Sequence, residues 1–160
     1  LMGPGGPLVV AYAASSPAQI ARLNIRGATL DAMRRAIRRC AGMWAARGGP
    51  VLPIVVDGRD VPDGLPGPAS ALERGDSRVP QIALAALCAK VLRDALLTRL
   101  DARWPHYGWA HNAGYGAAEH LAAVATAGIT PHHRRSFAPF VHPQADGRPW
   151  PIATRPAARG

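Results

Sequence analysis

The sequence has almost no lysine, two cysteines and no long apolar run. Lys90 is the single lysine, so arginine supplies nearly all of the 19 cationic side chains. Cys40 and Cys88 form no CxxC pair and lie in helix-like runs, which predicts free, buried thiols in a reducing compartment. Because no stretch is long enough to span a membrane and no signal peptide is visible, we expect a cytoplasmic protein without a membrane partner.

Several motifs that would identify other kinds of site are also missing. No HExxH and no paired CxxC accompany the histidines, so the sequence does not predict a zinc site. No GxSxG elbow is present for nucleophilic catalysis. The GPGG string near the start is not followed by Lys-Ser/Thr, which favours a flexible lead-in over a phosphate loop. The six histidines are His106, His111, His120, His132, His133 and His142.

Length and charge set the remaining bounds. A chain of 160 residues with 48% apolar residues suits one domain with one hydrophobic core. The formal net charge is +9, and arginine binds phosphate through bidentate hydrogen bonds, which favours a polyanionic partner. A genome rich in G and C would also encode arginine wherever a cation is needed, so charge alone leaves both interpretations open.

The amino-terminal half predicts two strands separated by a helix. Residues 8–14 are β-branched, aromatic and small, which is typical of a strand. Ser16 followed by Pro17 predicts a helix start, as a cap and a first-turn proline. Residues 51–56 are nearly all apolar and predict a buried strand, which should start late because of Pro53. An apolar stripe on the helix is formed by Leu30, Met33, Ile37 and Cys40, and a basic face by Arg34, Arg35, Arg38 and Arg39.

The carboxy-terminal half is expected to be mostly helical. A further short strand is predicted within 69–74, and a long helix from Pro80 to about residue 100. A second helix is predicted over 117–127. Alternating strands and helices indicate an α/β domain, which we expect to cover residues 1–140. The proline-rich remainder, residues 141–160, is predicted to be a disordered tail.

Asp57 is the first candidate for chemistry. It ends the predicted buried strand and precedes Gly58. Ligand sites of open α/β sheets lie at the carboxyl ends of strands, where an acid can bind a cation. An Asp-Gly turn with no catalytic role is the competing interpretation.

Asp94 is the second candidate, near the end of the long predicted helix. Two carboxylates on different elements can share a divalent cation, and oxygen ligands favour Mg or Mn over Zn. Lys90 precedes Asp94 by one helical turn, so an exposed ion pair between them explains the residue equally well.

Tyr115 lies between Gly114 and Gly116 in a predicted loop. Flanking glycines let the backbone approach a ligand closely, and an aromatic ring can stack on a base or a sugar. The alternative is a loop aromatic that folds onto the core.

Several segments of the chain, taken in order, resemble the ribonuclease HII family. The segments that carry the resemblance are LNIRGATLDAMRRA at 23–36, VDG at 56–58, GDSRV and AKVLRD within 75–94, the GYG loop at 114–116 and TPHHRRSFAP at 130–139.

The resemblance implies a divalent-metal endonuclease that hydrolyses the RNA strand of RNA–DNA hybrids, including ribonucleotides embedded in DNA, with Mn2+ or Mg2+. It implies that Asp57 and Asp94 are the third and fourth of four metal-binding acids, and that Tyr115 recognises the junction between ribonucleotide and deoxyribonucleotide. Lys90 and Arg93 are the expected nucleic-acid-binding cations. The expected partner is a hybrid duplex, and the expected state is a monomer.

The family's DEAGRG motif, which carries the first two acids, does not occur in these 160 residues. The implied fold is therefore ribonuclease H-like, with a mixed sheet flanked by helices and its amino-terminal strands missing. We expect a weakly active or inactive enzyme. The alternatives are a catalytically dead nucleic-acid-binding remnant and a pseudogene product that does not fold.

Overall fold

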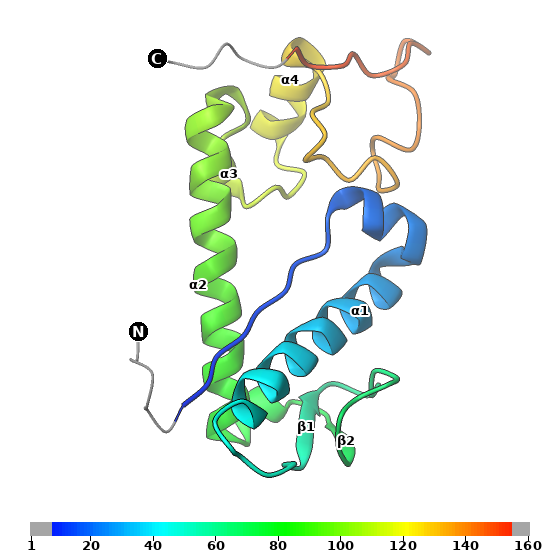
Figure 1. Ribbon diagram of the computed structural model, residues 1–160. Coiled ribbons are helices and arrows are strands. Elements are labelled where there is room, and N and C mark those ends of the chain that lie inside the picture. Colours follow the sequence, from blue (N-terminus) through cyan, green and yellow to red (C-terminus); the bar gives the residue numbers. More distant parts are fainter. Residues whose placement is uncertain (1–7, 155–160) are drawn as a thin grey trace. The chain divides into compact units, whose positions relative to one another are not determined.

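A computed structural model describes residues 8–154 of the chain (Figure 1). Within this range, residues 8–15 and 22–87 form one compact unit (unit 1), and residues 16–21 and 88–154 form a second (unit 2). The helices and strands, in chain order, are α1 (Pro17–Ala45), β1 (Ile54–Asp57), β2 (Ala69–Leu72), η1 (Gly75–Ser77), α2 (Pro80–Arg103), η2 (Pro105–Tyr107), α3 (Trp109–Asn112) and α4 (Ala118–Ala127).

The start of α1 confirms the predicted Ser16-Pro17 entry. The backbone N–H of Gln19 donates to Oγ of Ser16 at 3.2 Å, and the N–H of Ser16 donates to Oε1 of Gln19 at 2.8 Å. This reciprocal pair is a capping box, which satisfies two backbone donors that a helix start leaves without partners.

Helix α1 is kinked at Asn24, whose φ of 56° and ψ of 174° are not helical. The N–H of Gly27 donates to Oδ1 of Asn24 at 2.9 Å, so the asparagine caps the second part of the helix. The predicted stripe on this second part, Leu30, Met33, Ile37 and Cys40, is half-buried.

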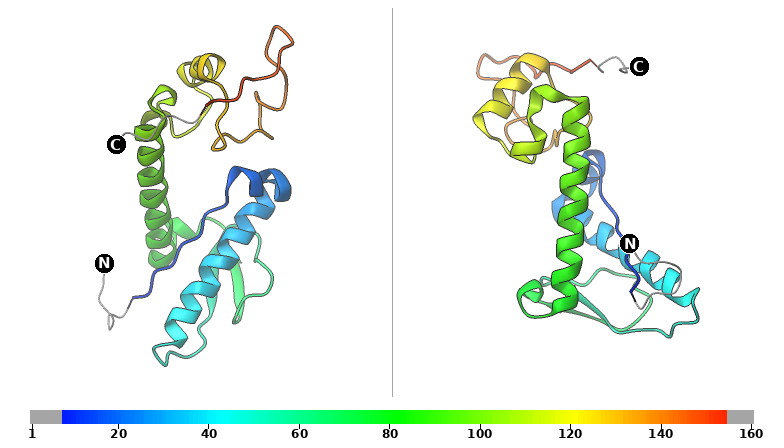
Figure 2. Two further views of the ribbon diagram at one scale, coloured as in Figure 1. Left: turned by 45° about the horizontal axis from the view of Figure 1, so that its top comes forward. Right: turned by 90° about the vertical axis from the view of Figure 1, so that its left-hand side faces the viewer.

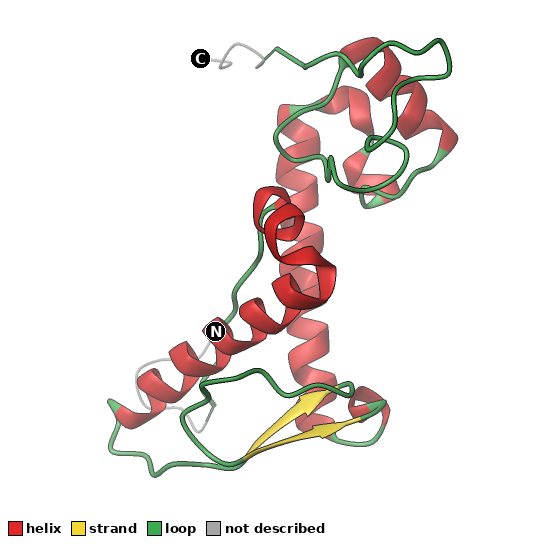
Figure 3. Ribbon diagram, turned by 90° about the vertical axis from the view of Figure 1, so that its right-hand side faces the viewer, coloured by secondary structure: helices red, strands yellow, loops and turns green. Residues whose placement is uncertain are grey.

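Strands β1 and β2 form a two-stranded parallel sheet in unit 1 (Figure 3). The register pairs Ile54 with Ala69 and Asp57 with Leu72. As predicted, β1 starts only after Pro53, because proline cannot donate to a strand ladder. Parallel strands combined with helices confirm the α/β class.

The strand predicted at 8–14 is wrong: these residues form no ladder in the structure. Side chains of α1 bind this segment instead. Sγ of Cys40 donates to the carbonyl of Val9 at 3.5 Å, and the guanidinium of Arg35 donates to the carbonyl of Ala14 at 3.0 Å. Strand composition alone does not make a strand, because the backbone groups also need a neighbouring ladder.

Helix α2 confirms the predicted long helix and is continuous in both views of Figure 2. Pro80 occupies its first turn, where a missing N–H costs nothing. Among the larger apolar residues of α2, Ile82 is buried, with 8% of its surface exposed. The exposed ones are Leu84, Leu87, Val91 and Leu96.

The core of unit 2 is aromatic. Trp104, Tyr107 and Trp109 are buried together with Val124 and Ile129. The rings of Tyr107 and Trp109 stack with centroids 5.0 Å apart. The hydroxyl of Tyr107 donates to the carbonyl of Gly128 at 2.7 Å, just past the end of α4, and burial raises the pKa of this phenol.

Residues 141–154 of the predicted tail pack within unit 2, whereas 155–160 lie outside the described residues. Ile152 forms a parallel bridge with Ile129, and the N–H of Ala153 donates to the carbonyl of Ile129 at 3.1 Å. The ring of Trp150 lies edge-on to Phe140, 5.4 Å between centroids. The division of the chain into 1–140 and 141–160 stays a prediction.

Both cysteines are free and half-buried, and burial raises the pKa of the Cys40 thiol. Among the described residues, no helix has the length and apolar character that a membrane span requires.

Candidate active site

Asp57 ends β1, at the edge of the sheet where sequence reasoning placed it. Its Oδ1 accepts a hydrogen bond of 2.8 Å from the backbone N–H of Gly75, at the start of η1. The next residue, Gly58, has a φ of 108° and donates its N–H to the carbonyl of Leu72. The bond from Gly58 continues the parallel ladder, and the chain bends after it without a hydrogen-bonded Asp-Gly turn. The carboxylate of Asp57 is held in one orientation by a buried amide.

A hollow of about 300 Å³ opens beside Asp57. Its walls include Leu30 and Met33 of α1, and its polar rim is an ion pair between Arg26 and Asp60. The guanidinium donates twice, Nε to Oδ2 at 2.9 Å and Nη2 to Oδ1 at 2.6 Å. These bonds from Arg26 lower the pKa of Asp60. Both oxygens of Asp60 accept from Arg26, whereas the bond from Gly75 uses Oδ1 of Asp57 alone.

Asp94 lies on the part of α2 that belongs to unit 2. Its Oδ2 is 3.7 Å from Nζ of Lys90, so the ion pair that competed with a ligand role exists. Both side chains are largely exposed, and such a pair adds little to stability. The structure brings Lys90 and Asp94 together within unit 2, while Asp57 belongs to unit 1. Binding of one metal ion by both acids stays a prediction.

The described residues do not by themselves form a metal site. No group of three or more His, Cys, Asp or Glu side chains within residues 8–154 is placed to hold a metal ion. Divalent Mg and Mn are bound by oxygen ligands, and an all-protein site needs several. The carboxylates of Asp57 and Asp94 have the right chemistry for such an ion but are too few to complete its coordination.

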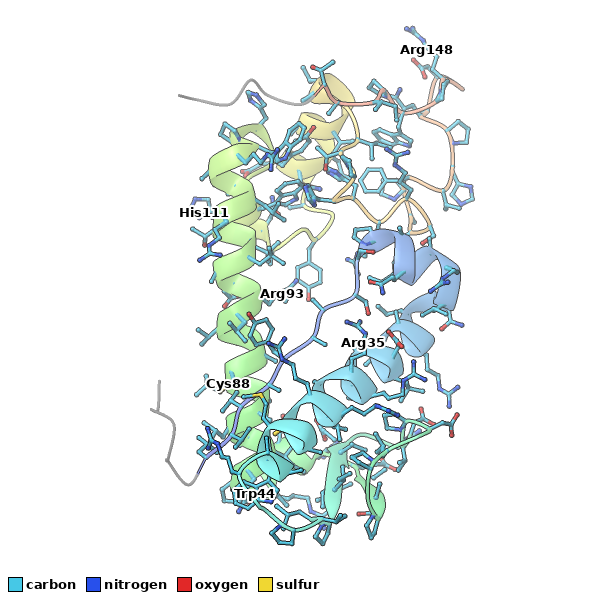
Figure 4. All side chains as sticks on the ribbon, in the orientation of Figure 1. Arg35, Trp44, Cys88, Arg93, His111 and Arg148 are labelled. Atoms are coloured by element: carbon cyan, nitrogen blue, oxygen red, sulfur yellow. The ribbon has the colours of Figure 1, made fainter. Side chains whose placement is uncertain are left out.

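Tyr115 lies in the loop between α3 and α4, and 65% of its surface is exposed. The alternative of a ring folded onto the core is therefore wrong. Arg93 projects from α2 (Figure 4). Its guanidinium lies over the ring of Tyr115, with the central carbon 5.8 Å from the centroid. The same guanidinium donates to the carbonyl of Ala113 at 2.9 Å. The structure thus brings together two of the predicted nucleic-acid-binding residues.

Sequence reasoning missed Asn112, which organises the turn before Tyr115. Its Nδ2 donates to the carbonyl of Tyr107 at 2.6 Å, and its Oδ1 accepts from the N–H of Gly114 at 2.8 Å. The turn needs support because Ala113, with a φ of 52°, is a non-glycine residue in the left-handed region. An asparagine that precedes Ala-Gly was the one signal in the sequence for this side-chain turn.

Two buried histidines, His120 and His133, lie against the ring of Tyr107 in the core of unit 2. His120 and His133 stack with centroids 5.2 Å apart. Nδ1 of His133 accepts the backbone N–H of Thr130 at 3.1 Å, so this nitrogen carries no proton. Burial, with a smaller contribution from His120, lowers the pKa of His133 to about 4. His133 is therefore neutral at neutral pH.

Comparisons with known proteins identify the family. The family model described as ribonuclease HII matches residues 53–140, which include Asp57, Asp94 and Tyr115. The ribonuclease HII of Sinorhizobium medicae is 46% identical over 131 residues, 82% of this chain and 57% of the relative. That of Rhodospirillum rubrum is 49% identical over 125 residues, 78% of this chain and 54% of the relative. That of Sinorhizobium fredii is 44% identical over 147 residues, 92% of this chain and 60% of the relative.

The chain spans less than two thirds of the length of these curated relatives. Its parallel strand pair and helices fit a ribonuclease H-like α/β fold. A family model that matches more than half of the chain, together with relatives more than two fifths identical over most of it, gives one conclusion: the chain belongs to the ribonuclease HII family.

Proposed function

We propose that this chain has the function of an endonuclease that hydrolyses the RNA strand of RNA–DNA hybrids, including ribonucleotides embedded in DNA. The single observation that carries the proposal is the carboxylate of Asp57. It ends a parallel strand, its Oδ1 is fixed by the amide of Gly75, and it lies beside a hollow of about 300 Å³. An oriented carboxylate at this edge of an α/β sheet is suited to a ligand role.

The proposal includes a divalent cation, Mn2+ or Mg2+, as the family membership implies. Asp57 and Asp94 are the proposed ligands from this chain. Because the described residues offer no group of three or more ligands, further oxygen ligands must come from elsewhere. We therefore propose that these 160 residues alone cleave weakly or not at all.

Substrate binding is proposed to involve Lys90, Arg93 and Tyr115. The net charge of +9 favours a polyanion, and the exposed ring of Tyr115 is available for stacking on a base or sugar. Contact with the ribose 2′-OH is what distinguishes RNA from DNA at such a site. We further propose that the protein acts in the cytoplasm as a monomer.

A cleavage assay tests the proposed activity. The purified chain would be incubated with a labelled duplex that carries one ribonucleotide, with Mn2+, with Mg2+ and with chelator. We expect slow or undetectable cleavage, with any activity dependent on metal and lost in Asp57→Asn and Asp94→Asn. Asp146→Asn is the matched control, because Asp146 forms an exposed ion pair with Arg148. Cleavage that survives chelator or both substitutions would contradict the assignment.

The second candidate is a nucleic-acid-binding protein without catalysis. The small number of metal ligands among the described residues favours it. It predicts binding of the hybrid without metal, weakened by salt, and no cleavage under any condition. A cooperative thermal melt followed by circular dichroism would exclude the remaining alternative, a product that does not fold.

A further inference from the structure

Two interactions of Arg93 join it to the loop that carries Tyr115. Its Nη2 donates to the carbonyl of Ala113 at 2.9 Å, and its guanidinium lies over the tyrosine ring at 5.8 Å from the centroid. We infer that Arg93 is a positioning residue for Tyr115, an inference that rests on the proposed substrate-binding role of that tyrosine. Sequence reasoning had placed Arg93 itself on the nucleic acid.

The geometry of the guanidinium explains why arginine suits this task. A guanidinium is planar, so it can stack on an aromatic face while its N–H groups donate in its own plane. Attraction between a cation and a ring extends to about 6 Å from the centroid, which includes the observed distance. A lysine at this position would keep the charge but not the two simultaneous contacts.

The loop before Tyr115 is held at two places around Ala113, its left-handed residue. Asn112 ties it to the core through Tyr107, and Arg93 ties it to α2 through the carbonyl of Ala113. The N–H of Tyr115 then donates to the carbonyl of Asn112 at 3.0 Å. The backbone immediately before the tyrosine is therefore fixed before any ligand arrives, which lowers the entropy that binding would otherwise cost.

One face of the Tyr115 ring is covered by Arg93, while 65% of the residue stays exposed. The other face is therefore available for stacking on a base or a sugar. In this arrangement a nucleotide would stack on the face opposite to Arg93.

Fluorine NMR tests the positioning without any ligand. The chain has three tyrosines, Tyr12, Tyr107 and Tyr115, so incorporation of 3-fluorotyrosine gives three signals, and Tyr115→Phe assigns one of them. We expect Arg93→Met to shift and narrow the Tyr115 signal while the other two stay in place. Arg93→Lys should give an intermediate shift. Arg99→Met, which removes the same charge from the same helix, is the control. An unchanged Tyr115 signal in Arg93→Met would overturn the inference.

Binding then separates positioning from direct contact with phosphate. The measurement is fluorescence anisotropy with a labelled duplex that carries one ribonucleotide, and the variants are Arg93→Met, Tyr115→Ala and the double variant. Stacking on one ring accounts for about 1–3 kcal/mol, so we expect Tyr115→Ala to weaken binding roughly 5- to 150-fold. Arg93→Met should weaken binding several-fold when Tyr115 is present and have little effect when it is absent.

The salt dependence of binding distinguishes direct contact between Arg93 and phosphate from positioning of Tyr115. If Arg93 bound a phosphate, Arg93→Met would reduce the slope of log affinity against log salt by about 0.9, with or without Tyr115. That result would overturn the inference and leave the proposed function in place. If Tyr115→Ala has no effect on binding, the proposed role of Tyr115 fails, and the NMR experiment still decides whether Arg93 positions the ring.

Discussion

Oδ1 of Asp57 and the backbone N–H of Gly75 are joined by a 2.8 Å hydrogen bond across 18 positions of the chain. Gly75 is buried, so an amide that lost this acceptor would have no solvent to replace it. The aspartate therefore supports the packing of unit 1 independently of any metal that it binds.

Asp57→Ala and Asp57→Asn should consequently differ in stability. Alanine removes the acceptor and leaves a buried donor unpaired, at a cost of about 1–3 kcal/mol in the free energy of unfolding. Asparagine keeps an oxygen at the same place and should cost about 1 kcal/mol less than alanine does. Urea unfolding of both variants measures the difference. Equal free energies of unfolding would show that the bond contributes nothing.

Gly75→Ala should destabilise unit 1 through Ile82. A Cβ on Gly75 would lie 2.7 Å from Cδ1 of Ile82 and 3.4 Å from Oδ1 of Asp57. Overpacking of this kind costs about 1–3 kcal/mol. Ile82→Val removes that Cδ1 atom, so the double variant should be more stable than the sum of the single effects predicts. Strict additivity in thermal melts would contradict the contact.

Acid should destabilise unit 2 through His133, which is 5% exposed and has a pKa of about 4 in the folded protein. The unfolded chain binds a proton at this residue near its ordinary pKa of 6.5, whereas the folded chain does not until about pH 4. The stability that follows from the neutral His133 is therefore fully present above pH 6.5. It is lost as the pH falls from 6.5 to 4, at a cost on the order of 1–3 kcal/mol in the free energy of unfolding.

Urea unfolding at a series of pH values measures this loss. His133→Asn places an oxygen where Nδ1 accepts from Thr130 but cannot titrate, so its stability should change less over the same range. His142→Asn is the control for loss of an exposed histidine. A pH dependence that His133→Asn does not alter would assign the effect to other groups.

Asn112→Ala should loosen the turn before Tyr115. It removes the bonds to the carbonyl of Tyr107 and the N–H of Gly114, for an expected loss of about 1–2 kcal/mol. Hydrogen exchange at the Gly114 amide should accelerate, because its acceptor is gone. His111→Ala changes the adjacent exposed residue and should leave this amide as it was. Unchanged exchange in Asn112→Ala would mean that the turn is held by other contacts.

The helix boundaries were predictable because their signals are local. Ser16 with Pro17, and Pro80, each act within one turn of the chain, and each marks a helix start in the structure. The late start of β1 after Pro53 follows from a missing donor in the same way.

The site was predictable only in part, because its contacts join distant residues. The resemblance to ribonuclease HII located Asp57 and Tyr115, but no local pattern shows that Gly75 holds the former or that Arg93 covers the latter. The error at 8–14 has the same origin. Its composition suits a strand, while pairing depends on a neighbour that a local pattern does not reveal.

Gly128 lies against the returning chain so closely that a Cβ would meet the nitrogen of Ala153 at 2.6 Å and the carbonyl carbon of Ile152 at 2.8 Å. The family match ends at Phe140, so a shortened chain for crystallisation could be ended there. Such a cut would remove the bridge between Ile129 and Ile152 and the segment that packs against Gly128. A shortened chain that keeps residues 151–153 retains these contacts.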